Sequence, residues 1–547
     1  MATGKRKLVV LVILDGWGIA PPGPGNAIAL AKTPQFDRLW TVYPHTQLQA
    51  SGEAVGLPPS EDGNSETGHL NIGAGNIVYQ DLPRINMAIA EGTFFNNPAF
   101  LKAIDHVQRN QSKLHLMGLI SDAGVHSSLN HLFALLRLAK DHNLPEVYLH
   151  LFTDGRDSSP TSSMVYIKNI QEKIKEIGVG QIASLIGRYF AMDRDHRWDR
   201  TQKAYDLLVS GLGKKTNSEE RAIAASYQDG ITDEFVEPIL LVKEDGQPRA
   251  LIEDDDAVIF FNYRVDRPRQ ITKAFVLPEF EQLEIKKAAF DPYAERYGKK
   301  QYEVPGETTT FVRQKILKNL CFVSMTQYEK DLPTQVAFAP VLVKMPLARL
   351  LSEYNIQQAH IAETEKFPHV TYFFNGGREK PFPGENQLKI ASPKVATYDL
   401  QPAMSASEVT KQVIKMIQSL TYQFIIVNYA NPDMVAHTGV LEAAVEACQI
   451  TDHYLGEIVK KTISFGGTAI VTADHGNVEE MINLQTGEVD TEHSTNLVPF
   501  IVANENLGRG GKSLRQGILA DVAPTILGLL DINVPSMMSG RDLLKTY

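Results

Sequence analysis

The residues of this chain best able to bind a metal ion stand directly after an apolar run near the carboxyl end. Asp474 and His475 follow residues 467–471, whose composition is typical of a buried strand. An Asp-His pair there contributes little to a core, whereas a carboxylate oxygen and an imidazole nitrogen together suit Zn²⁺ or Mn²⁺. Alone, the pair is as compatible with a solvated loop as with a metal site, so the other strand ends decide.

Other segments carry the same residue types close to apolar runs. Asp433 and His437 follow residues 424–428 and are four apart, so one helical turn places both side chains on one face. For each candidate alone, a solvated loop residue or a helix cap is the simpler interpretation. Together they predict two sites, each with three protein ligands and an open position, formed by Asp15, Asp433, His437, Asp474, His475 and His493. Oxygen and nitrogen ligands without a thiolate favour Mn²⁺, with Zn²⁺, Co²⁺ and Mg²⁺ as alternatives.

A candidate nucleophile, Ser65, lies between Gly63 and Gly68 at the expected start of a helix. Backbone N–H groups and the helix dipole favour a phosphate group at such a position. The alternative is a structural role in which the serine caps the helix. A neighbouring metal ion would activate the hydroxyl group for attack on phosphorus. Because two metal sites are predicted, we favour the nucleophile.

Arginines follow several apolar runs in the middle of the chain. Arginine binds carboxylate and phosphate groups through a planar, bidentate fork that lysine lacks. The alternative is surface ion pairing with nearby aspartates, which contributes little to stability. Five such residues in an acidic chain predict a small substrate with several negative charges, and they are Arg156, Arg188, Arg194, Arg264 and Arg267.

Short apolar runs alternate with amphipathic segments along the chain, a pattern that predicts βαβ units and mainly parallel sheets. The expected buried strands are residues 8–14, 113–119, 147–152, 181–186, 257–262, 322–325, 424–428 and 468–472. The expected helices include residues 131–142, 162–177, 201–210 and 407–420. Ligands bind at the carboxyl ends of strands in open α/β sheets, so these elements position the candidate residues.

Metal-ligand candidates lie in the outer segments and the arginines in the middle, which predicts two chemistries in two domains. We expect a metal-binding domain built from residues 1–80 and 341–547, with residues 81–340 inserted as a substrate domain. Residues 283–313 are polar and weakly periodic, and we expect them to form a surface insertion.

Composition limits the classes of partner. The chain has 547 residues and a formal net charge of -10, which argues against nucleic-acid binding. Two cysteines argue against a disulfide framework. Residues 8–14 are interrupted by Asp15 without a cleavage site, and no apolar run reaches the length of a membrane span. We therefore expect a cytoplasmic protein without a membrane partner.

Several motifs resemble those of the cofactor-independent phosphoglycerate mutases, a family of the alkaline-phosphatase-like superfamily. They cover essentially the whole chain and include Val12-Ile13-Leu14-Asp15-Gly16-Trp17-Gly18, Asn64-Ser65-Glu66, Asp154-Gly155-Arg156-Asp157, Gly187-Arg188-Tyr189-Phe190-Ala191-Met192-Asp193-Arg194, Glu363-Thr364-Glu365-Lys366-Phe367-Pro368-His369 and Ala473-Asp474-His475-Gly476-Asn477. The resemblance implies an α/β fold of two domains, each a mainly parallel sheet flanked by helices: an alkaline-phosphatase-like domain with an inserted transferase domain.

The resemblance also implies a reaction, the interconversion of 3-phosphoglycerate and 2-phosphoglycerate through a phosphoserine, without 2,3-bisphosphoglycerate. One Mn²⁺ would be held by Asp433, His437 and His493, and the other by Asp15, Asp474, His475 and the Ser65 oxygen. The substrate site would be lined by His126, Arg156, Asp157, Arg188, Arg194, Arg264, Arg267 and Lys366.

Roles in catalysis follow from this assignment. Ser65 would attack the phosphate group while Lys366 offsets charge on the phosphoryl oxygens. Arg264 and Arg267 would hold the substrate carboxylate, and Asp157 would act as base for the 2-hydroxyl group. We expect a monomer. The nearest alternative is a metal-dependent phosphatase or phosphopentomutase of the same superfamily, which has no evident need for the arginines.

Overall fold

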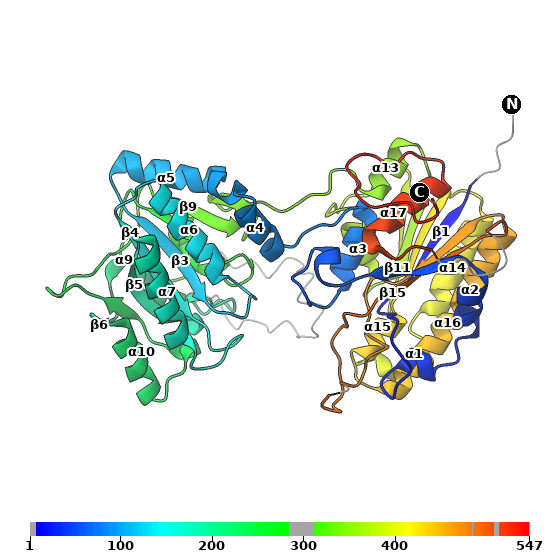
Figure 1. Cartoon of the computed structure of the whole chain (residues 1–547), viewed down its shortest axis with the longest axis horizontal. Coiled ribbons are helices and arrows are strands. Elements are labelled where there is room, and N and C mark those ends of the chain that lie inside the picture. Colours follow the sequence, from blue (N-terminus) through cyan, green and yellow to red (C-terminus); the bar gives the residue numbers. More distant parts are fainter. Residues whose placement is uncertain (1–6, 284–309, 484, 508–513, 546–547) are drawn as a thin grey trace. The chain divides into compact units, whose positions relative to one another are not determined.

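The computed structural model describes residues 7–283, 310–483, 485–507 and 514–545 and divides the chain into two compact α/β units. The first unit consists of Met1–Gln80 and Val341–Tyr547, and the second of Asp81–Pro340. In the part of the chain that the structure describes, each unit contains an eight-stranded sheet flanked by helices (Figure 1). The expected fold class, two mainly parallel sheets with flanking helices, is confirmed. The metal-binding and substrate-binding roles expected of the two units remain predictions.

The sheet of the first unit is mainly parallel, with an antiparallel strand near one edge. Strand β15 runs antiparallel to both of its neighbours, whereas every other pairing in this sheet is parallel. The strand order is β12 (Glu385–Ile390), β11 (Gln358–Glu363), β13 (Phe424–Tyr429), β1 (Val9–Leu14), β14 (Thr468–Thr472), β15 (Val498–Ala503), β2 (His45–Gln49) and β16 (Gly517–Ile518).

Register brings the candidate ligands of the first unit to one edge. Leu14 of β1 pairs with Tyr429 of β13, and Ile13 pairs with Thr472 of β14. The three strands therefore end at the same level, and the segments that follow them begin side by side. All residues of β1, β13 and β14 are buried, as expected for parallel strands covered on both faces.

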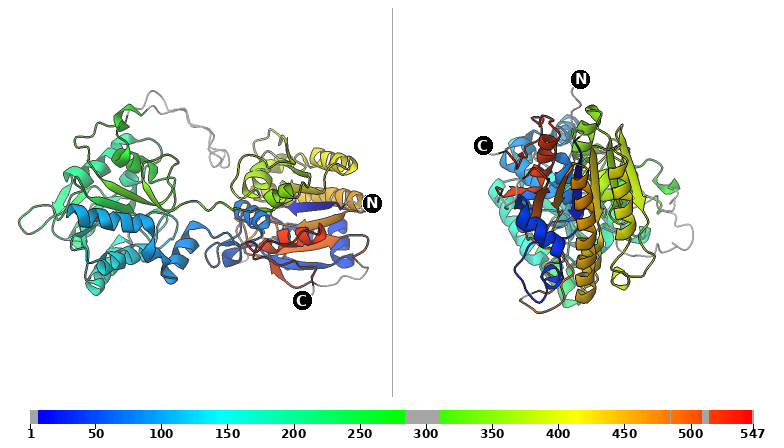
Figure 2. Two further views of the ribbon diagram at one scale, coloured as in Figure 1. Left: turned by 90° about the horizontal axis from the view of Figure 1, so that it is seen from above. Right: turned by 90° about the vertical axis from the view of Figure 1, so that its right-hand side faces the viewer.

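Helices of the first unit pack in two groups. In one group α16 (Leu441–Ser464) contacts α14 (Ala406–Gln418), α2 (Pro34–Val42), α1 (Ala27–Leu30) and α15 (Asn431–Ala436). In the other, α3 (Ser65–Ala74) contacts α17 (Val522–Leu529) and α13 (Leu347–Glu353). The long helix α16 runs alongside β1 and β14 (Figure 2).

The sheet of the second unit is also mainly parallel. Strand β7 is antiparallel to β5, and the remaining pairings are parallel. The strand order is β10 (Gln335–Phe338), β9 (Cys321–Thr326), β8 (Ala257–Phe260), β3 (Leu114–Ile120), β4 (Val147–Thr153), β5 (Gln181–Gly187), β7 (Ile239–Leu241) and β6 (Lys214–Thr216).

Both faces of this second sheet are covered. Leu114 and Leu116 of β3 contribute to one apolar cluster, and Met117 and Leu119 to another. The first cluster draws on α5 (Pro98–Asn110), α6 (Leu129–Asp141), α7 (Ser163–Ile177) and α10 (Glu219–Gln228), and the second on α8 (Arg188–Ala191), α9 (Trp198–Ser210) and α11 (Arg269–Val276). Helix α4 (Asp81–Ala90) begins the unit.

Register again aligns strand ends. Ile120 of β3 pairs with Thr153 of β4, which pairs with Gly187 of β5. Ser121 and Asp154 follow β3 and β4 directly, and Arg188 follows β5 as the first residue of α8, so the polar residues expected after the apolar runs meet at one edge of the sheet.

The expected surface insertion, residues 283–313, falls for the most part outside the described residues. Its described carboxyl end differs from the prediction, because Phe311 and Arg313 are buried. Arg313 donates hydrogen bonds to Glu281 and to the carbonyl oxygens of Ala274, Leu277 and Pro278, which explains how a charged residue is accommodated there.

No helix among the described residues combines the length and the apolar character needed to cross a membrane.

Candidate functional site

Three imidazole and carboxylate groups converge where β13 and β14 end. Asp433 lies in α15 and His437 caps it, so the four-residue spacing brings His437 Nε2 to 3.2 Å from Asp433 Oδ1. His493, from the loop before β15, places Nε2 at 3.1 Å from His437 Nε2 and 3.5 Å from Asp433 Oδ1. The expected proximity of Asp433 and His437 on one helical turn is confirmed.

Tautomers at this cluster indicate a site for a cation. His437 Nδ1 faces the carbonyl oxygen of Thr491, and His493 Nδ1 faces that of Gly63, each at 2.8 Å. A carbonyl oxygen only accepts, so both Nδ1 atoms carry protons and both Nε2 atoms of neutral rings present lone pairs. Three lone pairs, from these two rings and the Asp433 carboxylate, thus face one another. They repel unless a proton or a metal ion lies between them, so these residues fit a metal ion.

A second group surrounds Ser65. Ser65 Oγ lies 3.3 Å from Asp15 Oδ1 and 2.9 Å from His475 Nε2, and all three side chains are fully buried. Asp474 lies two residues after the end of β14, and its Oδ1 accepts from the backbone N–H of Gly16. The four residues expected from the resemblance to share one metal ion therefore lie together.

Ser65 does not cap its helix. The N-cap of α3 is Asn64, whose side chain accepts from the Thr67 N–H. Ser65 is the first helical residue, and its hydroxyl group is directed toward Asp15 and His475. The structural alternative for Ser65 is wrong, because the neighbouring asparagine performs that role.

Lys366 joins the two groups. Its Nζ donates to Asp15 Oδ1 and Asp433 Oδ2, both at 2.6 Å, and to Ser65 Oγ at 2.7 Å. The side chain is buried, and it follows β11 in the turn after Glu363. Lys366 therefore lies in the first unit among the candidate metal ligands, whereas the other expected substrate-binding residues lie in the second.

Electrostatics at this cluster depend on paired charges. Burial by itself raises the pKa of Asp433, but the Lys366 ammonium and the His437 imidazole outweigh it and hold this pKa well below its ordinary value. Burial lowers the pKa of His475, but Asp474, Asp15 and Asp433 outweigh it and raise the pKa to about 9. The pKa of Lys366 is raised because the same carboxylates outweigh burial.

Among the described residues, two sets of side chains lie close enough to share an ion, and they divide differently from the expected sets. One consists of Asp433, His475 and His493, and the other of Asp15, His69 and Asp474. His69 is an unsuitable ligand in this arrangement, because its Nδ1 faces the Ser65 carbonyl oxygen at 2.8 Å and its Nε2 faces Asn428 Nδ2 at 3.1 Å. Both ring nitrogens are thus occupied.

Residues not predicted from the sequence orient the cluster. Asn428 Nδ2 donates to Asp15 Oδ2, and Asn477 Nδ2 donates to Asp433 Oδ1. Glu479 accepts from the backbone N–H groups of Gly18 and Asn477. His69 stands four residues after Ser65 on the same helix, a spacing that could have identified it.

A second polar cluster lies at the strand ends of the second unit. Arg188 Nη1 donates to Asp157 Oδ2 and to Asp154 Oδ1, each at 2.5 Å, while Nη2 lies 3.1 Å from His126 Nε2. Arg188 and His126 are buried. Burial and the Arg188 and Arg264 guanidinium groups lower the pKa of His126 to about 3, so its ring is neutral at physiological pH.

Guanidinium groups extend this cluster. Asp266 accepts from Arg194 Nη1 at 2.8 Å and from Arg264 Nε at 3.2 Å. Arg267 donates to the carbonyl oxygen of Met192. Burial and the charges of Arg188, Arg194 and Arg156 lower the pKa of Arg267 to about 10. This excess of cations suits a ligand with several negative charges.

Arg156 also belongs to the cluster. Its backbone N–H donates to Asp154 Oδ1 at 3.2 Å, and its charge contributes to the lowered pKa of Arg267. Its Nη2 lies 2.7 Å from Glu234 Oε1, and its side chain is about half exposed. All seven residues expected to bind substrate in this unit therefore lie in one cluster. Surface ion pairing accounts for part of the contacts of Arg156, Arg194 and Arg264 but not for the buried Arg188.

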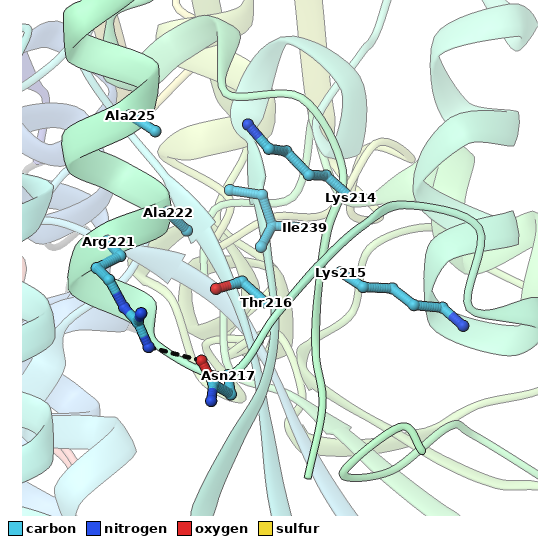
Figure 3. A pocket seen from close by; sticks show the side chains of 8 residues that line it. All are labelled: Lys214, Lys215, Thr216, Asn217, Arg221, Ala222, Ala225 and Ile239. Atoms are coloured by element: carbon cyan, nitrogen blue, oxygen red, sulfur yellow. Dashed lines mark hydrogen bonds between the residues drawn. The ribbon is translucent and has the colours of Figure 1, made fainter. Parts of the chain in front are cut away.

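A cavity of about 290 Å³ lies elsewhere in the second unit, between β6 and α10. Arg221 points toward Asn217, whereas Lys214 and Lys215 leave the strand in different directions (Figure 3). None of the predicted site residues lines this cavity, so it is separate from the clusters described above.

Comparison with known proteins agrees with the fold. Residues 85–330 match the family model described as the BPG-independent PGAM N-terminus. Curated proteins named 2,3-bisphosphoglycerate-independent phosphoglycerate mutase from Chloroflexus aurantiacus and Chloroflexus aggregans are 51% and 52% identical, each over 99% of both chains. One from Moorella thermoacetica is 47% identical over all of this chain and 99% of its own.

A solved structure is similar over almost the whole chain. Leishmania mexicana phosphoglycerate mutase, determined at low cobalt concentration, is 28% identical with a TM-score of 0.59 and covers 99% of this chain and 98% of its own. With the fold, these matches define the class as an isomerase, a phosphoglycerate mutase. The chain belongs to the family of 2,3-bisphosphoglycerate-independent phosphoglycerate mutases.

The expected activity follows from this membership, and the enzyme acts on phosphoglycerate, a small-molecule substrate. The alternatives, a metal-dependent phosphatase or a phosphopentomutase, are not favoured, because relatives of about half identity along the full length carry the mutase name. The family is metal-dependent, and the described residues contain candidate ligand groups.

Proposed function

We propose that the chain interconverts 3-phosphoglycerate and 2-phosphoglycerate through a phosphoserine at Ser65. The observation that carries the proposal is the environment of Ser65 Oγ, which lies 2.7 Å from Lys366 Nζ and 2.9 Å from His475 Nε2 at the start of α3. A buried hydroxyl group with an ammonium group and an imidazole in contact is equipped to attack phosphorus. The N-terminal N–H groups of α3 favour the arriving phosphate.

Two divalent ions complete this site in our proposal. Asp433, His437 and His493 hold one, and Asp15, Asp474, His475 and Ser65 hold the other. The lone pairs that face one another at His437, His493 and Asp433 support the first assignment. Oxygen and nitrogen donors favour Mn²⁺, with Co²⁺, Mg²⁺ and Zn²⁺ as alternatives. Bound ions would offset negative charge on the serine oxygen and on the phosphoryl oxygens.

The first transfer exchanges one bond for another. The Ser65 Oγ–P bond forms as the bond between phosphorus and the glycerate 3-oxygen breaks; the Ser65 hydroxyl group gives up one proton, and the released oxygen takes up one proton. Lys366 is placed to offset charge on the phosphoryl oxygens, because its Nζ contacts the attacking oxygen. The second transfer is the reverse reaction at the glycerate 2-oxygen.

Residues of the second unit hold glycerate between the two transfers. Arg264 and Arg267 bind the carboxylate group, since planar guanidinium groups match it. Arg156, Arg188 and Arg194 contribute further positive charge for the anionic substrate. Asp157 accepts the proton of the 2-hydroxyl group, and the neutral His126 donates a hydrogen bond to a phosphoryl oxygen.

A coupled assay tests the proposal. Purified enzyme should convert 3-phosphoglycerate without added 2,3-bisphosphoglycerate, lose activity with a chelator and regain it with Mn²⁺. Ser65→Ala should abolish turnover and leave the circular dichroism spectrum unchanged. Asn64→Ala serves as a control, because it removes the helix cap and leaves the Ser65 hydroxyl group in place. Turnover by a clean Ser65→Ala preparation would contradict the nucleophile assignment.

We further propose a cytoplasmic monomer that binds neither nucleic acid nor membranes. The net charge of -10 supports the absence of nucleic-acid binding. Light scattering of the purified chain measures the oligomeric state, and a dimer mass would contradict this part of the proposal.

A further inference from the structure

Asp154 is a fully buried carboxylate at the end of β4 whose two oxygens are both engaged. Oδ1 accepts from Arg188 Nη1 at 2.5 Å and from the backbone N–H groups of Arg156 and Asp157, each at 3.2 Å. Oδ2 accepts from Ser121 Oγ at 2.6 Å. These contacts join the segments that follow three adjacent strands, β3, β4 and β5.

Arg188 distributes the hydrogen bonds of this cluster. One of its nitrogens, Nη1, donates to both Asp154 and Asp157, and Nη2 lies against His126 Nε2. A guanidinium group only donates, so Nε2 of His126 accepts and the ring proton is on Nδ1. In the described part of the chain, His126 Nδ1 and Arg188 Nε have no hydrogen-bond partner. Two buried donors thus remain for a substrate that accepts.

We propose that Asp154 is a positioning residue: its carboxylate fixes the Arg188 guanidinium group so that Arg188 contacts Asp157 and His126 at once. Asp154 acts through Arg188, because its side chain is fully buried and both of its oxygens are already hydrogen-bonded. The same carboxylate sets the course of the loop that carries Arg156 and Asp157, because it accepts both of their backbone N–H groups.

The charge of Asp154 is required as well as its shape. Arg188 is buried, and its charge is balanced by Asp154 and by Asp157, whose side chain is 21% exposed. Burial raises the pKa of Asp154, but the hydrogen bonds from Ser121 and Arg188 outweigh it and lower the pKa. Without that negative charge, Arg188 has Asp157 as its remaining carboxylate partner among the described residues, and Asp157 is less free to accept a proton from substrate.

The test is Asp154→Asn in the full-length Mn²⁺ enzyme. An asparagine oxygen still accepts from Arg188 and the two N–H groups, and its amide can donate to Ser121, so the fold is retained while the charge is lost. We expect kcat/KM for 3-phosphoglycerate to fall at least tenfold. Asp256→Asn is the matched control, because Asp256 is equally buried and accepts from the N–H groups of Lys113 and Glu253 at the other end of the sheet. It should stay within twofold of wild type.

A double-mutant cycle with Arg188→Lys tests whether the effect of Asp154 on kcat/KM depends on Arg188. If Asp154 acts through Arg188, Asp154→Asn changes kcat/KM by less than twofold in the Arg188→Lys background. An undiminished tenfold loss in that background, or wild-type activity of the single variant, overturns the inference. If Asp154→Asn does not fold, Ser121→Ala loosens the same carboxylate, and its smaller loss of kcat/KM must likewise disappear with Arg188→Lys.

This inference depends on the proposed role of Arg188 in substrate binding. Wild-type kcat/KM for Arg188→Lys alone contradicts that role, whereas a strong loss in Arg188→Lys with no effect of Asp154→Asn contradicts only the positioning role of Asp154.

Discussion

Lys366→Met tests the electrostatics of the candidate metal site most sharply. Methionine has nearly the length of lysine but no charge, and Lys366 is 3% exposed. The change removes the Nζ contacts with Asp15 and Asp433, which are themselves buried. Removing one partner of a buried ion pair costs about 3–5 kcal/mol, because an uncompensated charge stays behind.

This cost should appear in the thermal unfolding of the metal-free protein. For a unit of roughly 290 residues, an unfolding entropy of about 2.1 cal/mol/K per residue converts the loss into a fall in Tm of roughly 5–8 °C. In saturating Mn²⁺ the fall should be much smaller, because bound cations neutralise the same carboxylates and stabilise the folded state. Tryptophan fluorescence suits the measurement, since two of the three tryptophans, Trp17 and Trp40, lie in the first unit.

Lys411→Met is the control for this measurement. Lys411 is 66% exposed and lies 4.0 Å from Glu408, a surface pair whose loss changes stability by at most about 1 kcal/mol. The reasoning is refuted if Lys366→Met lowers the Tm of the metal-free protein no more than Lys411→Met does. It is also refuted if the fall is equally large with and without Mn²⁺.

Three further predictions concern pH. The pKa of His475 is raised to about 9, so below that pH a metal ion must displace a proton from His475, and Mn²⁺ affinity should rise with pH. Calorimetry near pH 7.5 in two buffers of different ionisation enthalpy should detect the proton that Mn²⁺ binding releases. Burial raises the pKa of Glu363 from 4.5 to about 7, so between pH 4.5 and pH 7 the folded state holds a proton that the unfolded chain has lost, and stability declines as pH rises through this range. Glu363→Gln should therefore stabilise the protein at pH 8 by up to about 3 kcal/mol, as measured by urea unfolding. No gain in stability would contradict the raised pKa of Glu363. Burial lowers the pKa values of His115 and His150. The protein should therefore lose stability as pH falls below 6.5, because the unfolded chain then binds protons that the folded chain does not. His150→Gln should make the free energy of unfolding depend less steeply on pH in this range.

Most buried parallel strands were predictable because they are rich in apolar residues, but β11 (Gln358–Glu363), which is buried throughout and contains Gln358, His360 and Glu363, was missed. Residues 468–472 form β14 with the expected bounds, and the expected strand at 147–152 differs from β4 by one residue. Strands with many polar residues could not be predicted in this way. β12 (Glu385–Ile390), at one edge of its sheet, and β2 (His45–Gln49), next to the other edge, contain mostly polar residues, several of them partly exposed, so they resemble loops until their neighbours are known.

Candidate ligands were predictable because they follow those apolar runs. The parallel strands β1 and β14 end in register and so bring Asp15 and Asp474 together. The sequence shows this because each of the two residues follows the end of an apolar run. The positions of Asn428 and Glu479 were not predictable, because each depends on which loop of another segment lies beside it. Asp154 was visible in a motif, but its hydrogen bond to Arg188 requires the register of β4 and β5.

The most direct test of a covalent phosphoserine is to trap it. The full-length Mn²⁺ enzyme would be mixed with ³²P-labelled 3-phosphoglycerate, quenched in acid within milliseconds and digested for mass spectrometry. Our account predicts label on the peptide that contains Ser65, and loss of that label when Ser65 is replaced by alanine. Label on a different residue, or none while turnover proceeds, would contradict it.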